Sequence, residues 1–516
     1  MLNQIKVGPI LGFRGSKEGR WYTSALIVFQ GTSASPQLIF TTGGVSQREE
    51  KVMLLKSYGD CYVWRLDWSV LQTDTEQLID YTINAGETFH YVVPEKNKPL
   101  RICYGSCFGF HNQKDINKVK DKNGMWKVLQ QVHAEKPYHL FFMGGDQVYS
   151  DQIWENVLPL KDWLSKSLKK RVQAAFTTEM QEQVAQFYFE LYCQMWSQKL
   201  PAALMSQIPT LMMWDDHDIF DGWGSYSSEQ QECAVFKGIY SQAREHFRLF
   251  QLQAKNDEDV GEAILLGEYG YTYAYRIDDL AIVALDLRSE RTQNQVMSLE
   301  TWNCLQAWMT AELPQKLLPA DSPRKGCKHL LVMSGIPIVN ANLNLLETAY
   351  DIRPGQQRVE DDLKDQWLSR THQQERLRLI HRLLRFSQET GCRVTIISGD
   401  AHAASLGYIQ SEREPATRAE AHVINQLTSS AMVNLPPPAL VIYMMEKLLG
   451  GKIEAVDRGI TARLVKFAGT SRRILGARNW LSLTLDEQPC IWAEWYVEGE
   501  EKPYTKVIHP VGEQLS

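Results

Sequence analysis

Six short apolar segments between residues 100 and 397 constrain the fold of this chain more than any other feature. They span residues 100–104, 139–143, 210–214, 280–285, 329–333 and 393–397, and most are followed at once by polar or glycine residues. Amphipathic stretches of helical period lie between them, at residues 179–196, 234–251, 299–313 and 372–388. Short buried strands that alternate with helices predict a layered α/β domain.

The third apolar segment ends in a highly polar run, Asp215, Asp216, His217 and Asp218. Three carboxylates around one imidazole repel each other at neutral pH unless a positive charge lies among them, and a metal ion is the simplest such partner. Open α/β sheets hold their ligands at the carboxyl ends of the strands, so this position indicates an active site. The alternative is a solvated turn that caps a helix, since Asp is a favoured N-cap residue.

Chemically active residues follow other segments too, which argues against a simple turn. They are Cys107 after the first segment, Asp146, Tyr149 and Asp151 after the second, Asp286, Arg288 and Arg291 after the fourth, and Asp400 and His402 after the last. Thiolate, carboxylate, phenolate and imidazole groups bind transition metals, so their recurrence at strand ends predicts a metal site. Taken singly, each has an ordinary role as well, such as a buried cysteine, a core aromatic or a salt-bridged arginine.

The two ends of the chain have a different pattern. Residues 1–97 carry short runs rich in Val, Ile, Tyr and Thr, separated by turn residues, which predicts a small N-terminal β-sandwich domain. Residues 94–99, charged and flanked by prolines, are the expected linker into a second domain at residues 98–516. A helix is expected after the prolines at 436–438, and strands return at 480–485 and 491–496.

Composition limits the partners and the compartment. A formal charge of −6 and a pI near 6.1 give no reason to expect nucleic acid or an anionic membrane, although a local positive site can still hold a small anion. Residues 1–9 lack the features of a secretory signal, and no apolar stretch reaches the ~20 residues that a membrane helix needs. Nine scattered cysteines without a CxxC pair fit reduced thiols. We therefore expect a cytoplasmic protein.

Five motifs give the chain a family resemblance. They are Gly105-Ser106-Cys107, Gly145-Asp146-Gln147-Val148-Tyr149-Ser150-Asp151, Trp214-Asp215-Asp216-His217-Asp218, Asp286-Leu287-Arg288-Ser289-Glu290-Arg291 and Ser398-Gly399-Asp400-Ala401-His402. In this order they resemble the motifs of the PhoD-type alkaline phosphatases, members of the calcineurin-like metallophosphoesterase superfamily. The second and third motifs are specific to that family, and residues 1–97 are similar to the small β domain that precedes its catalytic domain.

The resemblance implies a four-layer α/β/β/α catalytic domain with two or more metal ions at its strand ends. The metal ligands that it implies are Cys107, Asp146, Tyr149, Asp216, Asp400 and His402. A phenolate at Tyr149 suits ferric iron, as in the family members that contain iron and calcium. Family members are often exported, whereas this chain shows no signal peptide, so magnesium, manganese or zinc is an alternative to calcium at the second position.

The residues also predict a mechanism. A bridging carboxylate at Asp146 or Asp216 holds two cations about 3.5–4 Å apart, where both activate one water and stabilise phosphoryl oxygens. His217 is the predicted catalytic acid for the leaving alkoxide. Arg288 is the predicted phosphate-binding residue, because a guanidinium contacts two oxygens at once, and Arg291 is a second candidate. The predicted activity is hydrolysis of a small phosphate monoester, diester or both.

Two other classes of function stay open. Cys107 with His217 as its base would make a thiol hydrolase, which needs an accessible thiolate of low pKa. A metal-stabilised binding protein without turnover keeps the ligands but has no use for His217 and Arg288. The sequence does not decide the substrate, the second metal or the oligomeric state.

Overall fold

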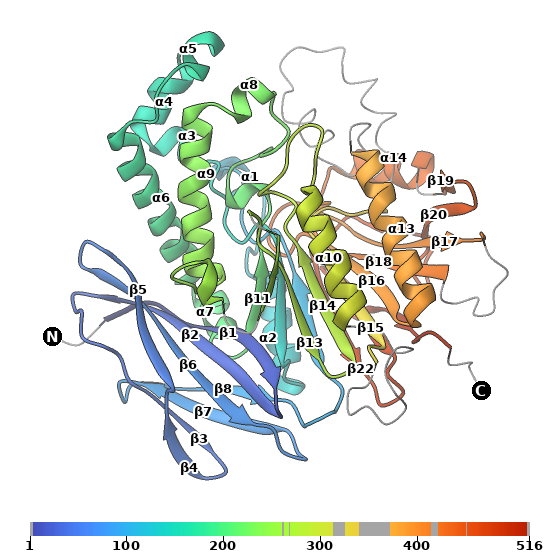
Figure 1. Ribbon diagram of the computed structural model, residues 1–516, viewed down its shortest axis with the longest axis horizontal. Coiled ribbons are helices and arrows are strands. Elements are labelled where there is room, and N and C mark those ends of the chain that lie inside the picture. The colour runs from blue at the N-terminus through green and yellow to red at the C-terminus, as the bar shows by residue number, and fades with distance from the viewer. Residues whose placement is uncertain are drawn as a thin grey trace.

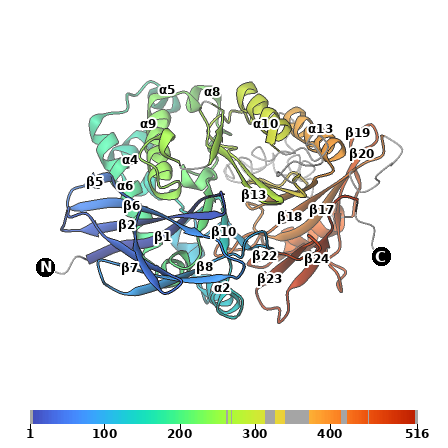
Figure 2. The same ribbon diagram turned by 60° about the horizontal axis from the view of Figure 1, so that its bottom comes forward.

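Two large β-sheets pack face to face, and helices cover the outer face of each sheet (Figures 1 and 2). The computed structural model describes residues 4–260, 263–267, 269–312, 326–339, 372–413, 422–449 and 451–512. The prediction of a layered α/β fold with a β-rich N-terminal region is confirmed.

The first sheet holds the first three predicted strands at its centre. In the described residues its order is β24 (Tyr504–Ile508), β23 (Ile491–Val497), β22 (Asn479–Leu485), β9 (Arg101–Gly105), β10 (Leu140–Gly144), β11 (Thr210–Met213), β1 (Gln4–Lys17), β2 (Arg20–Gln30), β6 (Cys61–Leu71) and β5 (Lys51–Tyr58). Strands β9, β10 and β11 run parallel, so their carboxyl ends share one edge. Figure 2 shows this sheet extending from the N-terminal strands through β10 to β22 and β23.

The second sheet contains the other three predicted strands. Its described order is β12 (Ile264–Leu266), β13 (Thr272–Ile277), β14 (Leu280–Leu285), β15 (His329–Ser334), β16 (Arg393–Ser398), β18 (Val423–Thr428), β17 (Ala404–Ser411), β20 (Ile460–Val465) and β19 (Glu454–Asp457), and β21 (Ile474–Leu475) pairs with β17. Strands β14, β15, β16 and β18 are parallel. The fourth and fifth motifs follow the carboxyl ends of β14 and β16.

The central strands are buried on both faces, which explains their nearly continuous apolar sequences. On β10, Phe142 lies in the core between the sheets with Met333 of β15, whereas Phe141 and Met143 face the helices outside. The outer helices are α2 (Gly124–Glu135), α6 (Thr178–Trp196) and α7 (Lys199–Met205) on the first sheet and α10 (Leu299–Glu312) and α13 (Gln373–Thr390) on the second. Figure 1 shows α10 and α13 in front of β14–β16.

The remaining helices in the described ranges lie in connections between strands. They are α1 (Gln113–Ile116), α3 (Ile153–Asn156), α4 (Leu158–Leu164), α5 (Leu168–Val172), α8 (Ser228–Gln231), α9 (Ala234–His246) and α14 (Ala439–Met444). Helix α9 packs against the outer helix α6. The helix predicted at 234–251 ends in a π-helical turn, η2 (Phe247–Gln251). None of the helices in the described ranges is long and apolar enough to cross a membrane.

The N-terminal region forms a sandwich that shares a sheet with the rest of the chain. Strands β4 (Val45–Arg48), β3 (Leu38–Thr42), β7 (Gln77–Ile83) and β8 (Thr88–Val93) form a separate small sheet. Trp68 of β6 packs on Phe40, Tyr81 and Tyr91 of that sheet, which closes the sandwich. Strand β1 also pairs in parallel with β11, so the large sheet continues past the boundary near residue 97, which stays a prediction.

Candidate metal centre

The loops after β9 and β10 bring Cys107 and Asp146 together. Both residues have a φ of 57°, a left-handed conformation that costs energy for residues other than glycine and is common at functional sites. The Cys107 amide donates to the Gly145 carbonyl (3.1 Å), and the Phe108 amide donates to the Asp146 carbonyl (2.9 Å). This pairing holds the Cys107 thiol 3.4 Å from Oδ2 of Asp146. Two strand ends therefore present one thiol and one carboxylate to the same point.

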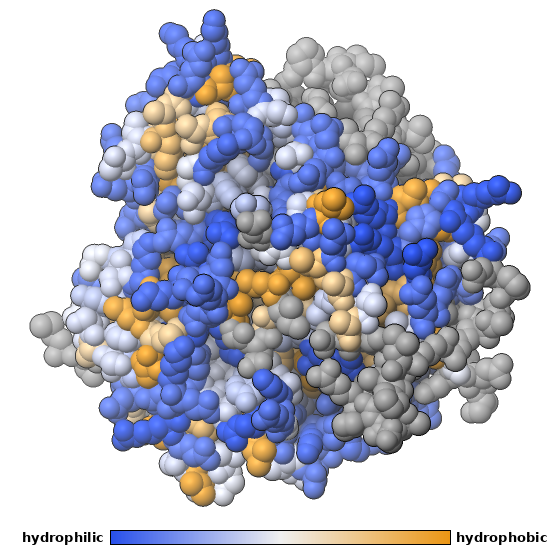
Figure 3. Space-filling view, viewed as in Figure 1, coloured by the Kyte–Doolittle hydropathy of each residue, from blue (hydrophilic) through white to orange (hydrophobic). Residues whose placement is uncertain are grey.

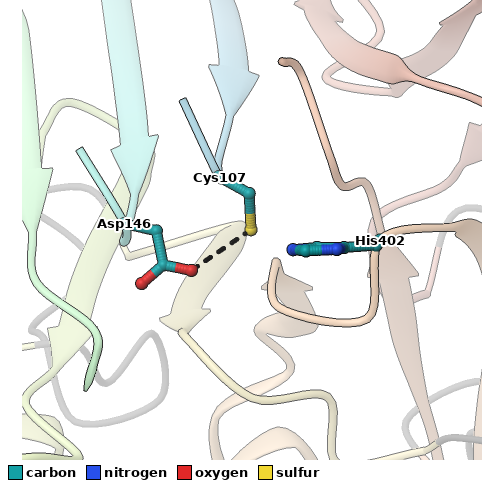
Figure 4. Close-up of side chains that lie close together, drawn as sticks. All are labelled: Cys107, Asp146 and His402. Atoms are coloured by element: carbon teal, nitrogen blue, oxygen red, sulfur yellow. Dashed lines mark hydrogen bonds between the residues drawn. The ribbon is translucent and has the colours of Figure 1, made fainter. Parts of the chain in front are cut away.

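His402 completes a first group of metal-binding side chains. One ligand atom each of Cys107, Asp146 and His402 lies within 4.8 Å of the others, and Figure 4 shows the three side chains pointing toward one another. The Tyr149 hydroxyl lies 3.4 Å from Oδ2 of Asp146. Asp400 has a φ of 58°, and its charge raises the pKa of the nearby Cys107 thiol beyond the effect of burial. Three predicted ligands thus lie close to Asp146, and a fourth, Asp400, lies near Cys107.

A second group shares Asp146 with the first. Ligand atoms of Asp146, Asp216 and His217 also lie within 4.8 Å of one another. Asp146 is 1% exposed, and its Oδ1 has no hydrogen-bond partner among the described residues. A buried carboxylate oxygen without a donor is costly, and a cation would satisfy it. The donor set therefore fits two metal ions joined by Asp146.

Asp218 stabilises the backbone around Asp146. It lies in the short 3₁₀ turn η1 (Asp216–Asp218), and its carboxylate accepts hydrogen bonds from the amides of Asp146 (2.8 Å), Val148 (3.2 Å) and Asp215 (2.9 Å). Burial raises its pKa to about 7. The turn after β11 thereby fixes the backbone of the Asp146 loop.

Asp151 orients His217, although its place in a motif suggested no role for it. Nδ1 of His217 lies 2.9 Å from Oδ2 of Asp151, which leaves Nε2 for a different partner. The ring stacks on Tyr149 at 4.3 Å and meets the ring of His111 at 4.4 Å. Burial opposes protonation, but the carboxylates of Asp151 and Asp216 outweigh it and raise the pKa of His217.

His111 could not be found from the sequence. It follows Cys107 by four residues in a loop, outside any motif, so no sequence signal marked it. Burial and the neighbouring His217 lower its pKa to about 3. With Asp151 and His217 it forms a further group of three possible metal ligands, again within 4.8 Å.

The structure gives Arg288 different contacts from the predicted one. It is 0% exposed; its Nε donates to Asp215, its Nη2 to Oδ1 of Asp216 (3.3 Å) and its Nη1 to the Trp223 carbonyl (3.2 Å). The charges of Arg288 and His217 outweigh burial and lower the pKa of Asp216. Arg288 is thus buried against carboxylates of the metal centre.

Arg291, the other predicted phosphate ligand, is also enclosed, at 2% exposed. Its Nη2 lies 3.3 Å from Nδ1 of His372 at the start of α13. Its side chain also packs against Gly224, where a Cβ atom would lie 2.6 Å from Cδ of Arg291. These contacts are to neighbouring residues of the protein. Contact between Arg291 and substrate stays a prediction.

Burial raises the pKa of the Cys107 thiol to about 11 and raises that of Asp146 well above its usual value. Cys107 is 0% exposed. In the absence of a cation, burial therefore favours the protonated form of both groups. A thiol nucleophile needs the opposite environment, accessible and of low pKa, so these properties disfavour the thiol hydrolase.

A cavity of about 540 Å³ adjoins the centre. Phe108 and Tyr149, from two of the loops described above, form part of its wall, and Trp126 and Leu191 line it from α2 and α6. This size, together with these aromatic and apolar side chains, is typical of small-molecule sites.

Comparison with known proteins identifies the family. The family model described as PhoD related phosphatase matches residues 87–357 and 352–453. The chain belongs to this family. The PhoD-related chain is also similar to a curated relative, the uncharacterized protein YGR266W of Saccharomyces cerevisiae (strain ATCC 204508 / S288c). The two are 27% identical over 535 residues, which covers 86% of this chain and 75% of the yeast protein.

Solved structures support the same fold for this PhoD-related protein. A solved structure of PhoD superimposes with a TM-score of 0.57 at 11% identity, covering 99% of this chain and 92% of the other. A purple acid phosphatase, PPD1, from yellow lupin (Lupinus luteus) seeds has a TM-score of 0.51 at 10% identity, covering 98% and 74%. At these identities the likeness is one of fold.

Proposed function

We propose that this PhoD-related protein is a metal-dependent hydrolase of phosphoric esters, acting on monoesters, diesters or both. The observation that carries the proposal is the position of Asp146, a buried carboxylate shared by two groups of metal-binding side chains and left with one unsatisfied oxygen. Two-metal phosphoesterases join their cations through such a carboxylate.

The side chains differ in the metals that they favour. Cys107, Tyr149 and Asp146, with Asp400 and His402, offer thiolate, phenolate, carboxylate and imidazole, which suits ferric iron. Asp146 and Asp216 would hold calcium or another divalent ion such as magnesium, manganese or zinc. When bound, the metals would supply a water of lowered pKa and stabilise the charge on the phosphoryl oxygens.

Side chains of the protein would supply the proton to the leaving group and keep Asp216 charged. His217, oriented by Asp151 through Nδ1, has Nε2 available to protonate the leaving alkoxide. Arg288 contacts Asp215 and Asp216 and would act as a positioning residue that keeps Asp216 ionised for a metal. The cavity beside Tyr149, lined by both aromatic and polar side chains, would take the organic part of the ester.

The direct test is hydrolysis of p-nitrophenyl phosphate and bis-p-nitrophenyl phosphate by the purified protein before and after exhaustive chelation. We expect turnover that chelation abolishes and added metal restores, because the attacking water has a lowered pKa only when it is bound to a metal. Full turnover by protein shown to be metal-free would refute a metal-dependent mechanism. Tight metal binding without turnover of either ester would favour the binding protein.

The roles of Asp216 and His217 can be separated by substitution. Asp216→Ala should lose bound metal and nearly all activity, whereas His217→Ala should keep its metal and lose roughly 10²–10⁴-fold in turnover, as expected for a catalytic acid. Metal content is measured by mass spectrometry alongside kcat. Since His217 lies within ligand distance of Asp146, a His217→Ala protein as poor in metal as Asp216→Ala would make His217 a ligand.

The colour of the purified protein tests whether ferric iron is bound at Tyr149. Phenolate bound to ferric iron absorbs visible light, whereas zinc, magnesium or calcium at the same ligands leaves a protein colourless. We expect aerobically purified protein to be violet to brown with stoichiometric iron, and Tyr149→Phe to shift or bleach the band. Tyr188→Phe, a buried tyrosine that bonds the Ile219 carbonyl, is the matched control and should keep the colour. A colourless, iron-free, fully active protein would contradict ferric iron but not the two-metal mechanism.

A further inference from the structure

A second group of charged side chains lies away from the metal centre, in a groove of about 640 Å³ along the outer helix α13. Among the described residues, its lining contains Arg378, His381, Arg382, Arg385 and Arg413 and no carboxylate. Figure 3 shows deep-blue, hydrophilic side chains over α10 and α13. This concentration of positive charge is unexpected in a chain with a net charge of −6.

The three arginines of α13 share one face of the helix. Residues 378, 382 and 385 have the spacing i, i+4, i+7, so their side chains follow one another along the groove over roughly 10 Å. Arg378 and Arg382 both lie over the ring of Trp302 of α10, with the guanidinium carbon 5.8 and 5.3 Å from its centre. Two like charges therefore contact the same indole ring.

These two guanidiniums form no ion pair within the described ranges, although Glu375 lies at the same indole, where its Oε2 accepts from Trp302 Nε1 (3.0 Å). Among the described residues, no carboxylate lies within 4.0 Å of Arg378 or Arg382, and Arg382 donates instead to the Trp302 carbonyl. Beside the groove, Asp457 accepts from both His381 (2.9 Å) and Arg413, and Glu389 lies 4.0 Å from Arg385. The four guanidiniums thus outnumber the three carboxylates next to them, Glu375, Glu389 and Asp457.

Two guanidiniums packed on an aromatic ring, with burial and the Arg378 charge lowering the pKa of Arg382, would gain stability from an anion placed between them. Guanidinium groups contact phosphate oxygens in pairs, and successive turns of the helix present them at regular intervals. A groove of about 640 Å³ has the size of a small-molecule site rather than of a long interface.

We propose that this groove is a binding site for a small anion that carries two or more phosphate groups, held by Arg378, Arg382 and Arg385. The source is either an inorganic oligophosphate or an organic polyphosphate, since the shared phosphate chemistry is what the arginines recognise. The site lies on the outer helical layer and does not depend on the proposed hydrolysis.

The test is calorimetric titration of the metal-loaded protein with inorganic tripolyphosphate, ATP and, as a carboxylate control, citrate. Arg378→Gln/Arg382→Gln should weaken tripolyphosphate binding at least about tenfold, and added salt should weaken binding to the native protein. ATP binding as tight as tripolyphosphate binding would indicate an organic polyphosphate, and weaker ATP binding an inorganic one.

Two controls keep the result decisive. Arg48→Gln, at an exposed arginine of β4, should leave the affinity unchanged. If the double variant unfolds, Arg385→Gln replaces it, because that side chain is 76% exposed and its loss should weaken binding without affecting the fold. Both groove variants should still hydrolyse p-nitrophenyl phosphate at the native rate. Unchanged tripolyphosphate affinity in the groove variants, or tighter binding of citrate, would overturn the proposal.

Discussion

Asp146→Asn is expected to lose both metal ions and to lower turnover at least about 10³-fold, or roughly 4 kcal/mol of transition-state stabilisation. Asp146 belongs to both groups of metal-binding side chains, whereas Cys107 and Asp216 each belong to one. An amide offers one neutral oxygen where two cations need a bridging carboxylate. The measurements are metal content and kcat for p-nitrophenyl phosphate.

The same substitution should leave the metal-free fold intact. Burial raises the pKa of Asp146, which favours its neutral carboxyl, and asparagine resembles that neutral form. Chelated Asp146→Asn should therefore unfold at the same urea concentration as the chelated native protein, or at a higher one. Asp162→Asn, at an exposed position in α4, is the matched control and should keep both metal and activity. A variant with full metal content would show that Asp146 does not join the two sites.

The sequence predicted the grouping of Cys107, Asp146 and His402 because one geometric rule applied to every strand. Parallel strands end at a common edge, so residues directly after their apolar segments must come together. These three residues lie far apart in the chain and still meet for this reason. The turns themselves are local, and their left-handed residues follow the strands at once.

Residues outside such strand ends could not be predicted in the same way. Strand β18 has no apolar run, because Asn425 and Gln426 are buried within it. The side chain of Gln426 is satisfied by the Ile338 amide (3.1 Å) and by Ser398 (3.0 Å), contacts between distant residues. The apolar pattern therefore does not predict that the loop after β18 reaches the metal centre, although Ser430 of this loop lies 3.1 Å from the Cys107 sulfur.

The sequence also does not show which distant strands pair with each other. The N-terminal strands have the pattern of an independent sandwich, but the partner of an edge strand is not encoded in its alternation. In the structure, β1 pairs with β11 through Gly12 and Thr210, which lie far apart in the chain. Whether residues 1–97 fold alone is a separate question that this pairing makes worth testing.

A motif shows where Arg288 lies in the sequence but not that its side chain is buried. Its sequence position suggested a ligand for phosphate, and its complete burial against two carboxylates favours a structural charge. The two roles predict different effects of substitution. A phosphate ligand acts on substrate binding, whereas a buried counter-ion acts on the stability of the fold.

Arg288→Met should destabilise the metal-free protein by about 3–5 kcal/mol at pH 7, because it leaves Asp215 and Asp216 buried without their cation. In the native fold the pKa of Asp216 lies below its usual value near 3.8, so its contribution to stability is present above pH 3.8 and is lost as the pH falls through the lowered pKa. In the variant the unpaired carboxylate has a raised pKa and takes up a proton as the pH falls. The difference in stability should therefore be large at pH 7 and shrink toward pH 4.

Urea unfolding of chelated protein at several pH values measures this difference, with Arg48→Met as the exposed control. Arg288→Lys keeps the charge but cannot contact Asp215, Asp216 and the Trp223 carbonyl together, so it should lose part of the stability. If Arg288→Met instead matches the native protein in stability and only raises KM for p-nitrophenyl phosphate, Arg288 contacts substrate. The pairing with the two aspartates would then be a feature of the metal-free state alone.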